Sequence, residues 1–264
     1  MSLLRKLERL HHGPRHHLEA GEKEWVEHRL LWLKNQFGLE PLQRAPLTPG
    51  SALLPAKWNC SEEAGANLLT RLCEFMRVDP ARLQLEYYLQ TLPKNLKRAF
   101  MGNTQESGAA GLYIESEESE RLIIALEVEG LRRPADLAAT LCHELGHVHL
   151  LADRRIAREE DDGEALTDLL TVYFGAGIFT ANSEFQFQQW QDTVSQGWST
   201  NRRGYLPERV WGYGLASYAW MRGEERPEWA KYLRQNIRYY FDDSLYYLTT
   251  TRETTLPFTI SQAG

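Results

Sequence analysis

The chain has 264 residues, enough for one large domain or two small ones, and 42% of them are hydrophobic, so it can bury a core. Its net charge of −6 gives no basic surface for nucleic acid. No apolar run is long enough to span a membrane, and the N-terminal stretch lacks the apolar core and cleavage site of a secretory signal. The three cysteines have no metal-type spacing, so we expect reduced thiols in a cytoplasmic protein.

Residues 1–56 are expected to form an arm, a helix and a proline-rich connector. The first 20 residues are charged and rich in histidine, and the Gly13-Pro14 break keeps the histidines from forming one ordered face. We interpret them as a solvated, mobile arm. Apolar residues at helical spacing predict an amphipathic helix over residues 22–37, and four prolines follow it.

Residues 57–182 are expected to form an α/β core. Ser61 can cap a helix whose apolar positions run from Leu68 to Phe75. The hydrophobic period then changes to two, which predicts strands over residues 83–88, 111–115 and 121–128. The last two are predicted to form a hairpin, and strand 121–128 is expected to pair with an extended peptide substrate. The sheet is therefore predicted to be small and mostly antiparallel.

A helix is predicted to start at Pro134, with a buried stripe formed by Leu137, Leu141, Leu145 and Val148. His143 and His147 lie off that stripe, one turn apart on a face that we expect to border a cleft. Two such histidines can hold one zinc ion, and Glu144 can then reach a water molecule on it. Gly146 is expected to let another segment approach closely.

A catalytic zinc ion takes three protein ligands, so two histidines are one ligand short. A second predicted helix carries Glu164 and Asp168, which are four residues apart and share a face. Glu164 can complete the metal site, and Asp168 can accept the second ring N–H of His143. Asp168 is itself an alternative ligand, and weaker alternatives are Asp153, Glu159, Glu160, Asp161 and Asp162. His149 points to another side of the helix, and Cys142 is expected to be a packing residue.

The motif His143-Glu144-x-x-His147, followed by Glu164-x-x-x-Asp168, resembles the gluzincin branch of the zincin metallopeptidases over roughly residues 108–182. The metzincin pattern is not met, because Leu150 occupies the position of its glycine. The resemblance implies an α+β, zincin-like fold with the sheet packed on the HExxH helix. It also implies Glu164 as third zinc ligand and Asp168 as the support of His143.

Residues 183–264 are expected to form a largely helical C-terminal subdomain. Aromatic residues at helical spacing predict one buried helix around Trp211–Trp220 and a second from Trp229 to Tyr246. No histidine follows His149, so a donor for the oxyanion of the reaction must come from elsewhere. Tyr205 and Tyr213 are the candidates, followed by Arg202 and Arg203.

Two functional hypotheses follow from these residues. The first is a zinc metallopeptidase with one zinc ion per chain, which hydrolyses a peptide or protein substrate with Glu144 as general base. The second is a non-catalytic or latent zincin-like module that binds a peptide or a partner protein. Hydrolysis of a small-molecule amide stays open, because the same zinc, water and glutamate attack any amide carbonyl. Neither hypothesis involves nucleic acid or a membrane.

Overall fold

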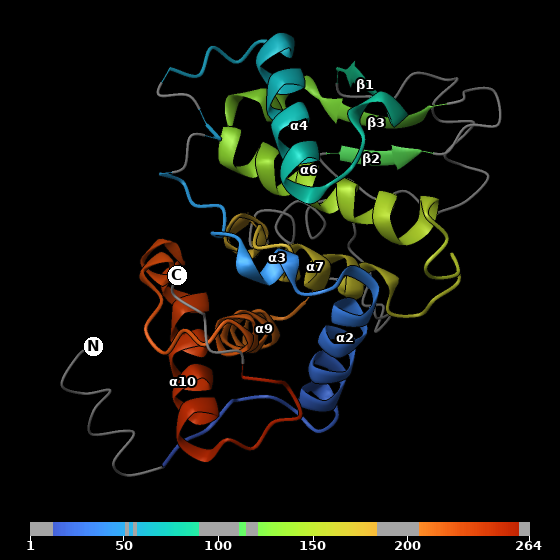
Figure 1. Ribbon diagram of the computed structural model, residues 1–264. Helices are drawn as coiled ribbons and strands as arrows, with labels where there is room; N and C mark the ends of the chain where they lie inside the picture. Colours follow the sequence, from blue (N-terminus) through green and yellow to red (C-terminus); the bar gives the residue numbers. More distant parts are fainter. Residues whose placement is uncertain are drawn as a thin grey trace, which may run out of the picture.

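The computed structural model describes residues 13–50, 53–54, 57–89, 111–114, 121–183 and 206–258. The described chain is a mixed α and β structure in which a small sheet and α4 (Glu62–Met76) lie on one side of α6 (Pro134–His147) (Figure 1). The other side of α6 faces α7 (Gly163–Tyr173). Beyond α7 lie α2 (Glu22–Phe37), α9 (Glu208–Met221) and α10 (Gln235–Thr251). The predicted combination of a small sheet with a largely helical C-terminal half is therefore observed.

The sheet has three strands in the order β1-β3-β2, and its strands are β1 (Leu83–Tyr88), β2 (Gly111–Ile114) and β3 (Leu122–Glu127). β2 and β3 pair antiparallel, as the predicted hairpin requires. β1 pairs parallel with β3 along its whole length, from Leu83 opposite Leu122 to Tyr88 opposite Glu127. The prediction of a mostly antiparallel sheet is wrong. Alternating side chains do not encode strand direction, because the period of two is the same in parallel and antiparallel strands.

The predicted pairing of strand 121–128 with a substrate is also wrong. β3 is the central strand and has a partner on each side, so its backbone groups are already used. Its residues 123–126 are all buried, as in a strand covered on both faces. The edge that lies beside the motif helix belongs to β2, which packs on α6.

The helices around the motif begin where the sequence predicts. Ser61 caps α4, since its Oγ accepts a hydrogen bond from the backbone N–H of Ala64 at 3.1 Å. α6 begins at Pro134, and the four predicted stripe residues are all at most 3% exposed. A short π-helix (Val148–Ala152) follows His147 directly. It ends the α-helical register of α6 immediately after the second histidine of the motif.

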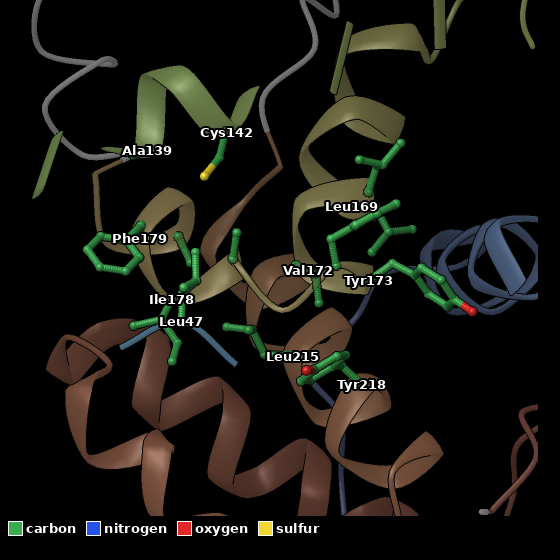
Figure 2. Close-up of a cluster of buried hydrophobic side chains, with 14 of the residues drawn as sticks. Leu47, Ala139, Cys142, Leu169, Val172, Tyr173, Ile178, Phe179, Leu215 and Tyr218 are labelled. Atoms are coloured by element: carbon green, nitrogen blue, oxygen red, sulfur yellow. The ribbon is translucent and has the colours of Figure 1, made fainter. Parts of the chain in front are cut away.

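α7 lies in the middle of the main hydrophobic core (Figure 2). Its Leu169, Val172 and Tyr173 belong to this core, and Tyr173 points toward α2, where its hydroxyl donates to the carbonyl of Gly38. Cys142 of α6 is fully buried in the same cluster, as predicted for a packing residue. Residues 177–183 form a further helical segment whose side chains join this core. The two helices that carry the motif residues are therefore held at their apolar faces by one continuous core.

The C-terminal part differs from its prediction in one element. The stretch expected to be a single helix from Trp229 to Tyr246 is divided into a 3-10 turn (Glu228–Tyr232) and α10. The backbone is extended at Leu233 and Arg234, between the two. Aromatic spacing alone could not locate this break, because both pieces bury aromatic residues against α9 or its neighbours.

The N-terminal residues that the structure describes are attached to the molecule rather than solvated. The ring of His17 donates to Asp243 of α10 at 2.9 Å, and His16 packs edge-on against Tyr247 of the same helix. The prediction of a mobile arm is therefore wrong for residues 13–20, whose aromatic contacts lie too far away in sequence to be predicted. Among the described residues, none of the helices combines the length and apolarity needed to cross a bilayer.

Candidate metal centre

Three predicted side chains meet where α6 packs on α7. The ligand atoms of His143, His147 and Glu164 all lie within 4.8 Å of one another. Glu164 Oε2 is 3.1 Å from Nε2 of His143 and 3.6 Å from Nε2 of His147. The two imidazole rings lie edge to face, with centroids 4.7 Å apart. The structure thus places both histidines of the motif and the predicted third residue around one point.

The close approach of the two helices depends on Gly146. A Cβ atom at this position would lie 2.7 Å from Cγ2 of Thr167 on α7, which is closer than real Cβ contacts. The predicted reason for a glycine here is therefore confirmed. The Oγ1 of Thr167 donates to the carbonyl of Gly163 at 2.8 Å and lies 3.5 Å from Nδ1 of His147. Thr167 was not predicted, because nothing in the sequence distinguishes it from other core threonines.

Asp168 lies behind His143, as predicted. Its Oδ1 accepts a hydrogen bond from Nδ1 of His143 at 2.9 Å, and its side chain is only 4% exposed. This bond directs the opposite nitrogen, Nε2, toward Glu164. Burial raises the pKa of Asp168, although the hydrogen bond from His143 opposes this effect.

The two carboxylates set the charge of the cluster. Burial disfavours a charged His143, but hydrogen bonds to Asp168 and Glu164 outweigh it and hold the pKa of His143 well above its usual value. Glu164 shows the complementary effect, since the two imidazoles lower its pKa far below that of a free glutamate in spite of its desolvation. The cluster therefore favours positive charge at the point between the three side chains, whether a proton or a metal cation supplies it.

Glu144 is buried, with 5% of its surface exposed, and precedes Leu145 of the core stripe. Tyr88 lies at the end of β1, and Glu144 acts on it electrostatically. Burial and the negative charges of Glu127 and Glu144 raise the pKa of Tyr88 to about 12. The phenol of Tyr88 therefore stays protonated and can donate a hydrogen bond in the neighbourhood of Glu144. Tyr88 was not predicted, because it merely alternates with the apolar residues of its strand.

The other acidic candidates lie elsewhere. Asp153 accepts hydrogen bonds from Arg82 and Arg155 at 2.8 and 2.5 Å. Glu160 and Asp162 bond to Arg29 of α2, so this part of the acidic loop is paired rather than merely solvated. The ring of His149 bonds to the carbonyl of Met76 at 2.7 Å. Its separation from the motif histidines agrees with the prediction that it points to another side of the helix.

Of the two tyrosines predicted as oxyanion donors, the structure describes Tyr213 but not Tyr205. Tyr213 is fully buried, and its hydroxyl donates to Glu27 at 2.6 Å, so its donor is engaged between α9 and α2. Its pKa is raised far above that of a free tyrosine by burial and by Glu27. Tyr205, like Arg202 and Arg203, lies outside the described residues, which resume at Leu206.

The donor set suits a zinc ion. Two imidazole nitrogens and one carboxylate oxygen are the ligands of many catalytic zinc sites, which keep a further position for water. Ligands about 2.0–2.1 Å from a tetrahedral ion lie about 3.3 Å from one another. The distances of 3.1 and 3.6 Å between Glu164 and the two rings agree with that spacing. Asp168 supplies the partner for the outer ring nitrogen of His143 that such ligands require.

Comparison of the chain with protein-family models, with curated proteins and with solved structures gives no match. The assignment of a function therefore depends on the geometry of the site itself.

Proposed function

We propose that the chain is a zinc-dependent metallopeptidase of the zincin type. The observation that carries the proposal is the convergence of His143 and His147 on Glu164, with Asp168 bonded to the outer nitrogen of His143. This arrangement comes from two helices, and each helix carries one of the local spacings of the gluzincin motif, HExxH and ExxxD. Two surface histidines that were one turn apart by chance would have no reason to face a carboxylate and to have a second, buried carboxylate behind them.

In the proposed reaction, His143, His147 and Glu164 would hold Zn²⁺. The bound ion would supply a water molecule acidified toward neutral pH and an electrophile for the peptide carbonyl. Glu144, next to the first histidine, takes the proton of the attacking water and delivers it to the leaving amine. Its burial shields the carboxylate from bulk water, which keeps the proton on the reaction path. Asp168 fixes the ring of His143 so that Nε2 faces Glu164, where the ion would be held.

The sheet edge supports a peptide as the substrate class. β2 lies beside α6, and within the described part of the chain it pairs with β3 on one side and with no strand on the other. An extended peptide can add to such an edge through backbone hydrogen bonds, which do not depend on side-chain identity. The substrate would then run past the motif helix.

The first test measures metal and activity together. The purified chain is expected to hold about one zinc ion and to cleave peptides of a mixed-sequence library. Glu144→Gln should retain the zinc ion and lose hydrolysis by about 10²- to 10⁴-fold, because only the proton transfer is removed. Glu159→Gln, at an exposed carboxylate between α6 and α7, is the matched control and should keep full activity.

The outcomes separate the hypotheses. A chain that binds zinc at full stoichiometry but cleaves no peptide at any pH would support the non-catalytic or latent binding module. Zinc content far below one per chain in a folded, freshly purified sample would contradict the proposed metal centre.

A further inference from the structure

The segment just before Glu164 forms four hydrogen bonds with side chains of α2, through Glu160 and Asp162. Asp162 accepts from the indole N–H of Trp25 at 2.6 Å. It also accepts two bonds from Arg29, at 2.7 Å from Nε and 2.6 Å from a terminal nitrogen. The same guanidinium reaches Glu160 at 2.6 Å. Arg29 is only 15% exposed and Asp162 24%, so these bonds are partly shielded from water.

Asp162 occupies the N-cap position of α7, but its side chain does not cap the helix. An N-cap aspartate normally accepts from the N–H groups of the first turn. Here the carboxylate is instead directed across to α2. The contact therefore links two elements more than 130 residues apart in sequence, at the cost of the local cap.

Glu164 lies two residues after Asp162, in the first turn of α7. The first turn of a helix frays most easily, because its N–H groups have no partner within the helix. The backbone of Asp162 accepts from the N–H of Leu166 at 2.8 Å, so fixing Asp162 fixes the turn that carries Glu164. The side chain of Glu164 is itself 51% exposed, and its carboxylate lies against the two imidazoles at 3.1 and 3.6 Å.

We infer that Arg29 and Trp25 are positioning residues for the metal ligand Glu164, and that they act through Asp162. α2 then contributes to the metal centre without touching it. The inference rests on the proposed zinc site. It goes beyond that proposal, because the motif itself comprises α6 and α7 alone.

A purely structural role is the competing explanation, and the chain offers a control for it. α2 makes a second two-bond ion pair, between Glu22 and Arg209 of α9, at 2.9 and 2.7 Å. This pair joins α2 to the molecule in the same manner but does not involve α7. If Arg29 only stabilised the packing of α2, then Arg29→Met and Arg209→Met would have similar effects on every measured property.

The experiment compares zinc affinity with stability. For the wild type and for Arg29→Met, Arg29→Lys, Trp25→Phe and Arg209→Met, the zinc Kd is measured by competition with a chromophoric chelator. The midpoint of urea unfolding is measured on the metal-free protein. The visible absorption spectrum of the Co²⁺-loaded protein reports the ligand geometry directly, which a merely structural role would leave unchanged.

Arg29→Met is expected to weaken zinc binding by about tenfold or more, the lower end of the effect of groups that orient metal ligands. It should also alter the intensity of the Co²⁺ spectrum. Arg29→Lys should recover part of the affinity, because it keeps the charge without the two-pronged geometry. Arg209→Met should lower the urea midpoint and leave the zinc Kd within about twofold of the wild type.

Two results would overturn the inference while leaving the metal site intact. One is a folded Arg29→Met with the zinc Kd and Co²⁺ spectrum of the wild type. The other is an equal loss of affinity in Arg209→Met. If Arg29→Met does not fold, Trp25→Phe takes its place, because it removes a single hydrogen bond to Asp162. Its zinc Kd and Co²⁺ spectrum are then compared with those of the wild type and of Arg209→Met. A wild-type chain that binds no zinc would overturn the proposed function and this inference together.

Discussion

The imidazole of His143 lies between two carboxylates that differ in their freedom to move. Asp168 is 4% exposed and bonded to Nδ1, so it fixes the ring. Glu164 is 51% exposed on the other side, so it can adjust its position when a cation enters. A carboxylate that orients a histidine ligand is expected to be buried, as Asp168 is. A carboxylate that itself coordinates the ion is expected to be more exposed, as Glu164 is.

Asp168→Asn tests that division. Asparagine keeps the shape of the side chain but removes the charge that favours a donating Nδ1–H, so we expect the zinc Kd to rise by about 10- to 100-fold. The measurement is chelator competition. Asp153→Asn is the matched control, since Asp153 pairs with Arg82 and Arg155 outside the cluster, and its zinc Kd should not change. Unaltered zinc binding in Asp168→Asn would contradict the orienting role.

Tyr213→Phe separates a structural tyrosine from a catalytic one. Loss of the hydroxyl removes the 2.6 Å hydrogen bond to Oε1 of the buried Glu27, which keeps Lys23 at 2.8 Å, so we expect the free energy of unfolding to fall by about 1–2 kcal/mol. The zinc content and kcat of the variant should stay at the wild-type value. Urea unfolding and peptide hydrolysis are the measurements. A large loss of kcat without loss of stability would instead support Tyr213 as an oxyanion donor.

At the scale of the elements, the contact of α6 with α7 forms the site. The histidines belong to one helix and the carboxylates to the other, so the distance between the helix axes determines whether the ligands can share an ion. Gly146 and Thr167 limit this distance, because a Cβ atom at position 146 would lie only 2.7 Å from Cγ2 of Thr167. Within each helix the spacing of four residues is local, and this is why the sequence could predict that His143, His147 and Glu164 lie together.

Gly146→Ala should push the two helices apart. The added Cβ would lie 2.7 Å from Cγ2 of Thr167, a β-branched side chain with little rotamer freedom in a helix. Alanine favours the helix by about 1 kcal/mol, but the overlap costs about 1–3 kcal/mol, so we expect weaker zinc binding with little gain in stability. Thr167→Ser removes the clashing methyl and keeps the hydroxyl that bonds to Gly163.

The double variant Gly146→Ala with Thr167→Ser is therefore expected to recover most of the zinc affinity. Chelator competition on the two single variants and the double variant forms a complete cycle. If the double variant binds zinc no better than Gly146→Ala alone, the close approach is not controlled by this contact.

At the scale of the whole molecule, the unpredicted features are those that join distant parts of the chain. The direction of β1, the end of the helix predicted from Trp229 and the attachment of residues 13–20 all depend on such contacts. The hydroxyl of Tyr213 bonds to a residue 186 positions away, and no periodicity could indicate that pairing. Local patterns predicted the helices and the motif, whereas the partners of buried polar groups required the structure.

Glu27 of α2 is one of the residues that connect distant parts of the chain. Its ionisation makes the free energy of unfolding depend on pH. The carboxylate is 3% exposed and accepts hydrogen bonds from Tyr213 of α9 and from Thr255 after α10. Burial opposes its charge, but these bonds and that from Lys23 outweigh it and lower the pKa of Glu27 from 4.5 to about 2. The folded state therefore binds a proton more weakly than the unfolded chain, and the resulting stability is complete above pH 4.5.

This contribution should disappear as the pH falls from 4.5 toward 2, and it amounts to at most about 3 kcal/mol. We expect Glu27→Gln to be less stable than the wild type at neutral pH, because the amide cannot hold the charge that the donors favour. The difference in free energy of unfolding should shrink through that acidic window, as the wild-type carboxylate becomes protonated. Urea unfolding at a series of pH values measures it. A difference that stays constant or grows on acidification would show that Glu27 does not link α2 to the C-terminal helices through its charge.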